Sequence, residues 1–292
     1  MISQIKKYIS LVVFAHTIFA LPFALIGFAL SLPSPLSSLS LQSPLSLLLL
    51  KILLCMVTAR NSAMSFNRYI DRHIDAQNQR TKTRELPSGS LTSKAVLTFF
   101  LLNMILFIIS CYTINNLCFY LSFPALMIIC GYSYTKRFTW WSHMILGLSL
   151  SIAPAGAYIA TTGTLALPIL LLSIIVLFWV TGFDILYALP DEEHDRTHHL
   201  HSIPQRFGRK RALWISAGAH LFVIPLLYLF GRTAHLTLGY WIAASLFTAF
   251  LLYQHLIITE NDISKLNTAF FTSNGIASIL FATLTITNIL HP

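Results

Sequence analysis

Acidic side chains are scarce in this chain and are concentrated in two short segments. The 292 residues include only 10 Asp and Glu, and eight of these lie within residues 67–89 and 184–206. In a chain rich in apolar segments, acidic residues contribute little to membrane orientation, so topology does not explain the clustering. Charged groups next to apolar segments are costly and usually functional. The two segments are therefore the first place to look for chemistry.

Within both segments polar residues recur at intervals of three or four positions, which places them on one face of a helix. The first face carries Asn67, Asp71 and Asp75, and the second carries Asp184, Tyr187, Asp191 and Asp195. Two carboxylates about 4 Å apart repel each other by roughly 4 kcal/mol at an effective dielectric constant of 20. Each aspartate pair therefore predicts a bound cation that offsets this repulsion.

Magnesium is the cation that fits such pairs best. Mg²⁺ binds one or two carboxylates, keeps several waters and completes its octahedron with phosphate oxygens of a substrate. Two aspartate pairs that face each other therefore predict a diphosphate held through Mg²⁺. The basic loop 80–84 and the pair Lys136-Arg137 supply positive charge for the remaining diphosphate oxygens.

The elements that must carry these residues are membrane-spanning helices. Charged residues form 10% of the chain, against roughly 25% in an ordinary soluble domain, hydrophobic residues form 55%, and the mean hydropathy is +0.70. We expect an all-α membrane protein that forms a single domain over residues 1–292, with nine transmembrane helices around a central cavity that opens to the cytoplasmic face. Nine segments have about the 20 apolar residues that a span needs: 9–30, 45–66, 93–112, 115–133, 142–162, 166–189, 211–230, 236–258 and 267–290.

The basic residues predict the orientation of these helices. If the nine segments alternate in direction, 16 of the 19 Lys and Arg residues fall on the side of the N-terminus, and only Arg232 falls on the other. The positive-inside rule therefore places the N-terminus and both acidic segments at the cytoplasmic face of the cytoplasmic membrane. The net charge of +9 is explained by topology, and no soluble basic face with aromatic readers indicates nucleic acid. The lipid bilayer is the expected partner, and no obligate protein partner is evident.

At these residues the chain resembles the UbiA superfamily of intramembrane aromatic prenyltransferases. The first family motif, N-x-x-x-D-x-x-x-D, is matched by Asn67, Asp71 and Asp75, and the second, D-x-x-Y-x-x-x-D-x-x-x-D, by Asp184, Tyr187, Asp191 and Asp195. Residues 80–89, 134–139 and 201–208 are similar to the family's R-T-x-x-R-x-L-P-S-G, Y-x-K-R and H-S-I-P-x-R-F-G loops. Five motifs in order, with nine apolar segments, extend the resemblance over essentially the whole chain.

The resemblance implies a Mg²⁺-dependent transfer of a polyprenyl group from a polyprenyl diphosphate to a small aromatic acceptor, in the synthesis of ubiquinone or menaquinone. It implies that the catalytic and Mg²⁺-binding residues are Asp71, Asp75, Asp191 and Asp195. The candidate diphosphate ligands are Asn67, Arg68, Arg72, Lys82, Arg84, Lys136 and Arg206. The candidate acceptor ligands are His16, Arg137, Asp184 and Tyr187.

The first apolar segment leaves the acceptor open. The 4-hydroxybenzoate branch of the family often has an arginine before a proline there, whereas this chain has His16 before Pro22 and no arginine. This version looks like the group that includes menaquinone prenyltransferases of the futalosine route. An acceptor of the 4-hydroxybenzoate type is the first expectation, and 1,4-dihydroxy-6-naphthoate is the alternative.

Two other classes of membrane protein also use acidic residues. A cation-coupled transporter would place its acids near the bilayer midplane on broken helices, whereas the acids here lie at the ends of the apolar segments. A CDP-alcohol phosphotransferase needs the string D-G-x-x-A-R between its aspartates, and that string is absent from the sequence.

Two local features bear on the second segment. Pro190 removes a helix hydrogen bond directly before Asp191, so the helix either ends near Leu189 or kinks there, and the shared face depends on which occurs. His194 and His198 have a spacing that a zinc site can use. Because carboxylates dominate this segment, a solvated loop is the favoured interpretation of the histidines.

Overall fold

The computed structural model describes residues 2–12, 19–32 and 43–291, and every regular element in these ranges is helical. The all-α architecture predicted from the sequence is therefore confirmed. Eight helices in these ranges are long and apolar enough to cross a membrane, by length and composition, as in a multi-pass integral membrane protein. They are α3 (Ser43–Gln77), α4 (Ser93–Tyr112), α5 (Asn116–Thr135), α6 (Ser142–Thr162), α7 (Leu167–Tyr187), α9 (Ile203–Thr233), α10 (Leu238–Ile257) and α11 (Asn274–Leu290), the last continuing the π-helix η4 (Thr268–Ser273). Shorter elements are α1 (Ile2–Leu11), α2 (Leu21–Leu30), the 3-10 turn η3 (Leu189–Asp191) and α8 (Glu192–Thr197).

The first predicted segment, 9–30, differs from expectation, and nine spans become eight in the described ranges. Here α1 ends at Leu11, and α2 begins at Leu21 with Pro22 in its first turn. Proline is tolerated in the first turn, where its missing N–H would have no helical partner, so Pro22 marks the start of a new helix. Ten residues of α2 reach about 15 Å, roughly half of a bilayer core. The candidate acceptor ligand His16 lies outside the described residues.

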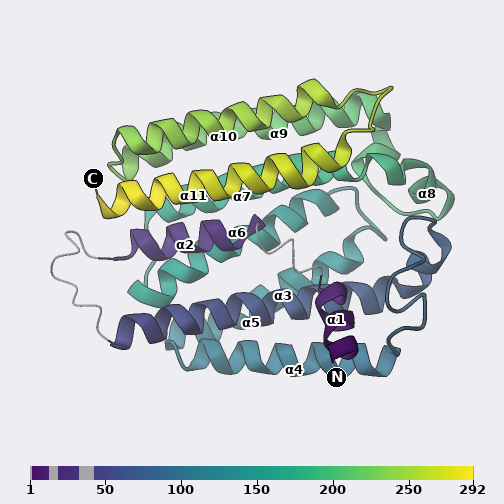
Figure 1. The fold of residues 1–292 in the computed structure, drawn as a ribbon, viewed down its shortest axis with the longest axis horizontal. Helices are drawn as coiled ribbons and strands as arrows, with labels where there is room; N and C mark the ends of the chain where they lie inside the picture. The colour runs from purple at the N-terminus through teal and green to yellow at the C-terminus, as the bar shows by residue number, and fades with distance from the viewer. Residues whose placement is uncertain (1, 13–18, 33–42, 292) are drawn as a thin grey trace.

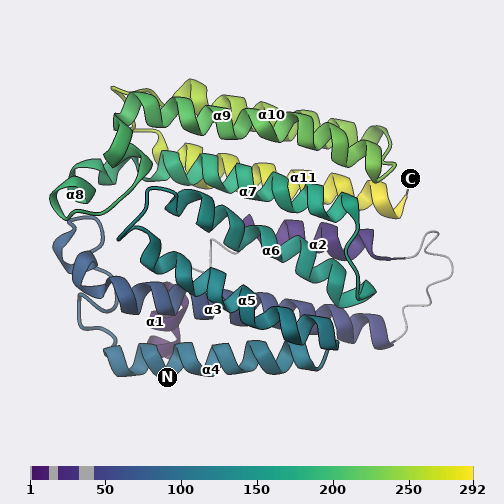
Figure 2. The same cartoon turned by 180° about the vertical axis from the view of Figure 1, so that it is seen from behind.

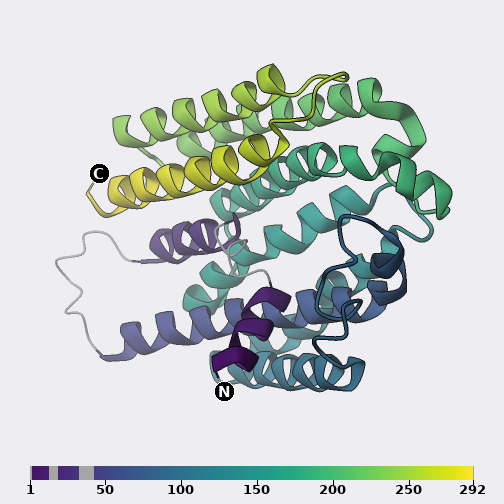
Figure 3. The same cartoon turned by 45° about the vertical axis from the view of Figure 1, so that its right-hand side comes forward.

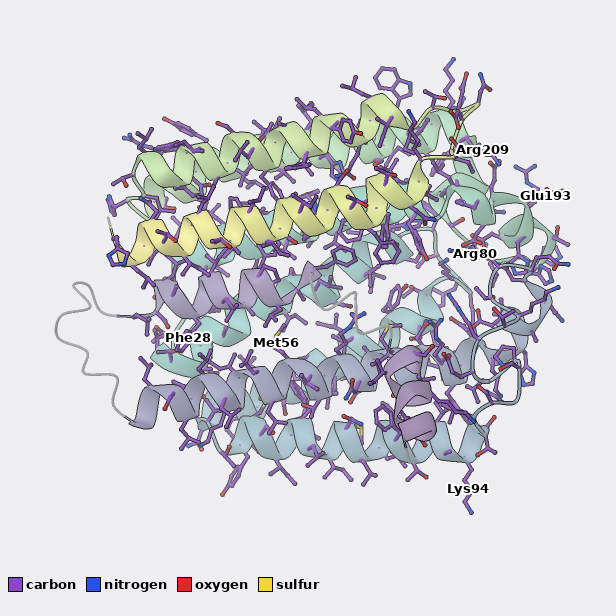
Figure 4. The ribbon with its side chains drawn as sticks, viewed as in Figure 1. Phe28, Met56, Arg80, Lys94, Glu193 and Arg209 are labelled. Atoms are coloured by element: carbon purple, nitrogen blue, oxygen red, sulfur yellow. The ribbon has the colours of Figure 1, made fainter. Side chains whose placement is uncertain are left out.

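The long helices run side by side in two groups (Figures 1 and 2). The first group is α3, α4 and α5, and the second group is α7, α9, α10 and α11. Helix α6 joins them, because it packs on both α5 and α7 and carries α2 beside it. Phe28 of α2 and Met56 of α3 belong to one hydrophobic cluster, which lies where α2 faces the first group (Figure 4).

Helix α7 forms the centre of the second group. It is the most buried of the eight candidate spans, whereas α3 and α5 expose most of their apolar surface, as helices that face lipid do. The fully buried indole of Trp179 packs on the rings of Phe23, Phe183 and Phe247, with centroids 5.0, 5.0 and 5.6 Å away. Large aromatic side chains of this kind contribute strongly to core packing.

Glycines let the helices around α7 approach one another closely. A Cβ atom on Gly147 of α6 would lie 2.4 Å from the carbonyl oxygen of Leu177, and one on Gly182 of α7 would lie 2.2 Å from the ring of His220 on α9. Small residues at such contacts are typical of helix packing in membranes. Helices α6 and α9 therefore both pack closely against α7.

The charged loops gather at one end of the bundle, which Figure 3 brings forward. This end, called the carboxylate end below, consists of residues 78–92, 136–141 and 188–202. The C-terminus lies at the opposite end (Figure 1).

Candidate functional site

The first aspartate pair lies near the C-terminal end of α3, which stays helical through Gln77. Asn67 donates a hydrogen bond from Nδ2 to Oδ2 of Asp71, one turn along the helix, at 3.0 Å. Asp75 is buried one turn later, and its backbone carbonyl accepts a hydrogen bond from Oγ1 of Thr81 at 3.0 Å. The loop after α3 is thereby tied to the end of the helix that carries the pair.

Arginines from the neighbouring loops contact three of the carboxylates. The pairs are Arg84 with Asp75 at 2.7 Å, Arg137 with Asp71 at 2.9 Å, and Arg80 with Asp191. Arg80 uses two nitrogens, and its Nε lies 3.1 Å from Oδ1 of Asp191. A bidentate contact of this kind fixes orientation as well as distance. Because Asn78 also donates to Asp191, at 3.4 Å, the loop after α3 joins the two aspartate segments directly.

The second segment does not stay on one helix. Helix α7 carries Asp184 and ends at Tyr187, η3 contains Pro190 and Asp191, and α8 carries Asp195. The expectation of a single helical face is therefore wrong, because proline cannot donate the helical hydrogen bond and the chain takes a 3-10 turn instead. The three carboxylates reach the carboxylate end from three successive elements.

Lys136 lies among these carboxylates, directly after α5. Burial alone would lower the pKa of its ammonium group, but the charge of Asp195, with Tyr132, Asp191 and Asp184, outweighs burial and raises that pKa above its ordinary value. No hydrogen bond or ion pair of its Nζ is present within the described ranges. Lys136 therefore holds a full positive charge that no single carboxylate takes up.

An aromatic wall adjoins the charged residues. The guanidinium carbon of Arg80 lies 4.9 Å from the ring centroid of Tyr187. Phe270 stacks on Tyr187 with centroids 4.1 Å apart, and its own ring packs on Phe19 and Phe183 at 5.3 Å each. Phe270 lies in η4, and π-helical turns inside α-helices are frequent at functional sites. Tyr187 thus lies between the ionic contacts and an apolar aromatic cluster.

Some predicted site residues lie away from this cluster. Arg72 donates from Nη1 to the carbonyl of Tyr69 at 2.6 Å and lies over the ring of that tyrosine at 4.6 Å. The side chains of Lys82 and Arg206 are exposed. Figure 4 shows Arg80 within the carboxylate end, whereas Glu193 lies at its outer edge.

A hollow of about 390 Å³ lies beside the first pair, between the end of α3 and the loop after α8. Its lining consists of Ile70, His73, Ile74, Arg137, His198, His199 and Leu200. It gives the edge of the site an approach from outside, while the central cavity expected from the sequence stays a prediction.

The candidate ligands chosen from the sequence did not include four residues that contact the site: Asn78, Arg80, His143 and Ser202, although Arg80 belongs to the basic loop 80–84 that was assigned to the diphosphate. Arg80 is the first residue of the R-T-x-x-R stretch, and that motif was the available signal. Ser202 precedes Ile203-Pro204, an N-cap followed by a first-turn proline, and its side chain indeed accepts from the backbone of Gln205. For His143 the signal was a histidine inside an apolar segment.

Two buried polar atoms test whether a metal ion with its phosphate ligands fits here. Oδ2 of Asp75 and Nε of Arg68 are buried and have no hydrogen-bond partner among the residues that the structure describes. A carboxylate oxygen without a partner is a ligand that Mg²⁺ prefers, and a guanidinium nitrogen without a partner suits a phosphate oxygen. The site therefore fits a magnesium diphosphate.

The same donors do not favour zinc. Within the described ranges no three His, Cys, Asp or Glu side chains come close enough together to hold one ion. Zinc sites need at least three protein ligands, so the stacked rings of His194 and His198 lack a third partner. Magnesium differs, because it needs only one or two carboxylates when waters and phosphate complete its shell.

A model of the UbiA prenyltransferase family matches residues 20–276, a range that contains both aspartate segments. The chain belongs to the UbiA prenyltransferase family. It is therefore an enzyme, a transferase of prenyl groups. The resemblance inferred from the motifs is confirmed, and the transporter and CDP-alcohol phosphotransferase alternatives are wrong.

Relatives of this UbiA-family chain carry names that specify an acceptor. The chain is 30% identical over 223 residues to a protein of Tolumonas auensis named 4-hydroxybenzoate octaprenyltransferase, covering 76% of this chain and 78% of that protein. It is 31% identical over 238 residues to a protein of the same name from Vibrio campbellii, covering 80% of this chain and 81% of that protein.

Solved structures of UbiA homologues share the fold. A homologue from Aeropyrum pernix K1 superimposes with a TM-score of 0.82 at 26% identity, covering 94% of this chain and 98% of that one. A homologue from Archaeoglobus fulgidus, solved with DMAPP and Mg²⁺ bound, superimposes with a TM-score of 0.76 at 20% identity, covering 98% of this chain and 100% of that one. At that identity the second likeness concerns the fold alone.

Proposed function

We propose that this UbiA-family enzyme transfers a polyprenyl group from a polyprenyl diphosphate to a small aromatic acid of the 4-hydroxybenzoate type, in the synthesis of a respiratory quinone. The observation that carries the proposal is the meeting of two aspartate segments at one end of the bundle, joined by Arg80 and Asp191. The names of relatives at about 30% identity support the acceptor. The whole chain, 1–292, acts as one domain.

The basic groups of the carboxylate end would bind the diphosphate. Within the described part of the chain, Arg68 has a buried nitrogen without a hydrogen-bond partner and Lys136 makes no direct carboxylate contact, so both could bind an anion. Arg80 and Arg84 contact carboxylates and would turn to the phosphate oxygens, which offer equivalent charge-assisted bonds. Asn67 orients Asp71, while Arg72, Lys82 and Arg206 remain candidates at the edge of the site.

The residues that would hold Mg²⁺ are Asp71, Asp75, Asp191 and Asp195. When bound, the metal would neutralise the diphosphate and make it a better leaving group. Oδ2 of Asp75, which has no hydrogen-bond partner among the described residues, would be one metal ligand. Asp71 and Asp191, whose carboxylates contact arginines in this structure, would supply two more. That the Archaeoglobus fulgidus homologue was solved with Mg²⁺ supports this assignment.

The reaction that fits this site breaks the C1–O bond of the donor. The bonding electrons leave with the diphosphate oxygen, where Arg68, Arg84 and Lys136 stabilise the charge, and an allylic cation remains. A ring carbon of the acceptor donates an electron pair to C1, and loss of its proton restores aromaticity. The stacked rings of Tyr187 and Phe270 keep water away from the cation.

A separate group of residues is proposed to bind the acceptor. Arg137 lines the hollow beside Asp71 and offers a positive charge to an acceptor carboxylate, with Asp184 and Tyr187 as further candidates. His16 remains a candidate from the sequence. A histidine instead of an arginine there favours 1,4-dihydroxy-6-naphthoate as the second acceptor to be tested.

The proposed function is tested by mass spectrometry on membranes that contain the full chain. Geranyl diphosphate, Mg²⁺ and equal amounts of both acceptors are supplied, and the prenylated product identifies the acceptor. Asp71→Asn and Asp191→Asn keep side-chain size but remove a metal ligand, so we expect turnover to fall by at least about 100-fold. The matched control is Asp262→Asn, because Asp262 is an exposed acid in the loop after α10. Full turnover in both site variants would overturn the proposal.

A further inference from the structure

His143 lies where three helices come together, and its side chain is completely buried. It is the second residue of α6. Its Nδ1 lies 2.7 Å from Oδ2 of Asp184, near the end of α7, and its Nε2 lies 3.3 Å from the backbone nitrogen of Ile203, at the start of α9. One imidazole ring therefore bridges the ends of α6, α7 and α9.

The two contacts determine which ring nitrogen carries the proton. A backbone N–H can only donate, so Nε2 of His143 accepts from Ile203 with its lone pair, and Nδ1 carries the proton and donates to Asp184. The imidazole is therefore neutral and adds no positive charge beside Asp184. The negative charge that faces Lys136 is preserved.

The start of α9 carries this connection on to the second aspartate segment. Ser202, the residue before Ile203, donates from Oγ to Oδ2 of Asp195 at 2.7 Å and accepts from the backbone N–H of Gln205 at 3.3 Å. Ser202 is 0% exposed and Asp195 is 2% exposed. Hydrogen bonds shielded from water in this way are strong and are costly to leave unmade.

A backbone contact ties Lys136 to the same junction. The N–H of His201, next to Ser202, donates to the carbonyl of Lys136 at 2.6 Å. A shift of the start of α9 would therefore move Asp195 and disturb the surroundings of Lys136 together. The α6–α7–α9 junction controls both the carboxylate and the cation that face the proposed diphosphate.

We propose that His143 is a positioning residue of the prenyl-transfer site. Through its two ring nitrogens it holds Asp184 and the start of α9 in the register in which Ser202 presents Asp195 to a divalent cation. This inference rests on the proposed function. It concerns a residue outside both aspartate segments that acts on the site through its neighbours.

Three substitutions separate this role from simple filling of space. His143→Gln keeps one donor for Asp184 and one acceptor for Ile203. His143→Glu keeps the acceptor, but its ionised carboxylate has no proton to donate to Asp184. His143→Leu removes both the donor and the acceptor. The matched control is His255→Leu, because His255 on α10 also makes a hydrogen bond through a ring nitrogen, to Nδ1 of His220, and belongs to none of the site contacts.

The readout is the affinity of the purified full chain for Mn²⁺ in the presence of geranyl diphosphate, measured by electron paramagnetic resonance without acceptor. We expect His143→Leu and His143→Glu to weaken Mn²⁺ binding by about tenfold or more, as the loss of groups that orient metal ligands does, and His143→Gln to stay within about twofold of wild type. In turnover assays the Mg²⁺ concentration for half-maximal rate should rise in the same order, with little change in KM for the acceptor. His255→Leu should bind Mn²⁺ as the wild type does.

The Gln and Glu variants keep the test decisive if the Leu variant does not fold, because the two side chains have nearly the same shape. The Glu variant lacks the donor and places a negative charge beside Asp184 in its stead. Equal Mn²⁺ affinity of these two variants, or wild-type affinity of His143→Leu, would overturn the role of His143. A wild-type protein that binds no Mn²⁺ with geranyl diphosphate would instead overturn the proposed function. The two failures are thus distinguishable.

Discussion

At the scale of single residues, the site is defined by charges that the protein leaves incompletely neutralised. Burying an unpaired polar or charged group is costly, and a fold under no functional demand avoids it. Among the described residues, Arg68 nevertheless has a buried nitrogen without a hydrogen-bond partner, and Asp75 has a buried oxygen without one. A bound ligand, ion or water is the usual partner of such atoms.

Arg68 should therefore contribute more to catalytic activity than to the stability of the fold. We expect Arg68→Leu to raise the donor KM or lower kcat/KM by roughly 10- to 100-fold, the equivalent of a lost charge-assisted hydrogen bond. Its melting temperature should be unchanged or higher, since an apolar group has replaced a buried charge. Steady-state kinetics and thermal unfolding in detergent check the two effects.

The matched control is Lys94→Leu, at the outer edge of α4 (Figure 4). It should change neither kinetics nor melting. A variant at Arg68 that melts much lower than wild type would show that this guanidinium serves the fold instead.

The arginine–aspartate pairs predict how metal and diphosphate bind together. A guanidinium that leaves Asp75 or Asp191 for Mg²⁺ needs a new acceptor, and a diphosphate supplies one. We therefore expect Mg²⁺ with inorganic diphosphate to raise the melting temperature by more than the sum of the two shifts measured separately. EDTA should abolish prenyl transfer, and excess Mg²⁺ should restore it. Additive shifts would contradict this coupling.

The chemistry of these residues was largely predictable, but their partners were not. Spacing alone predicted Asp71, Asp75, Asp191 and Asp195 as metal ligands, because repulsion between nearby acids is offset by a cation, and this assignment stays a prediction. The contacts of His143 with Asp184 and of Ser202 with Asp195 depend on how three helix ends meet, which no local pattern specifies. Arg72, by contrast, fitted the charge pattern, yet it contacts the ring of its neighbour Tyr69.

At the scale of elements, helix ends decide where the site residues lie. The predicted segments 93–112 and 142–162 coincide with α4 and α6, since their apolar runs end where the helices end. Helix α3 continues past the predicted end at residue 66 to Gln77. The polar residues after position 66 end the apolar segment, but they do not end the helix. Hydropathy indicates which residues lie in lipid, so the helix predicted from it ended before the turns that carry Asp71 and Asp75.

Gly208 predicts a backbone effect within α9. Its φ of 77° and ψ of 164° lie in a region that essentially only glycine occupies, and nothing lies within 4 Å of where a Cβ would be. Gly208→Ala should therefore lose about 1–3 kcal/mol through backbone strain alone. We expect a melting temperature lower by several degrees and weaker Mn²⁺ binding, since Ser202 is the N-cap of the short helical stretch that Gly208 interrupts.

Gly218→Ala is the control in the same helix. A Cβ at Gly218 also meets nothing within 4 Å, but no positive φ is present there. Alanine is favoured over glycine in a helix interior by about 1 kcal/mol, so this variant should melt at the same temperature or higher. Equal melting of both variants would refute the strain at Gly208.

At the scale of the whole molecule, the charge distribution predicts how the bundle sits in the membrane. Loops of the carboxylate end carry the basic residues 80–84 and 136–137, the basic residues 206–211 follow in the first turns of α9, and the C-terminus lies at the other end. Alkaline phosphatase fused after His291 should therefore be active outside the cytoplasm, while the same enzyme inserted after Ser88 should be inactive. The reverse pattern of activity would contradict the proposed orientation.

The division of the helices into two groups also has a consequence for biosynthesis. The chain is synthesised from its N-terminus, so α3, α4 and α5 enter the bilayer before α7 is made. The partners of Asp71 and Asp75 are Arg137 and Arg84, which are synthesised before α7. The partner of Arg80 is Asp191, which is synthesised 111 residues later. The first group can therefore neutralise its acids during insertion, and the site closes only when the second aspartate segment emerges.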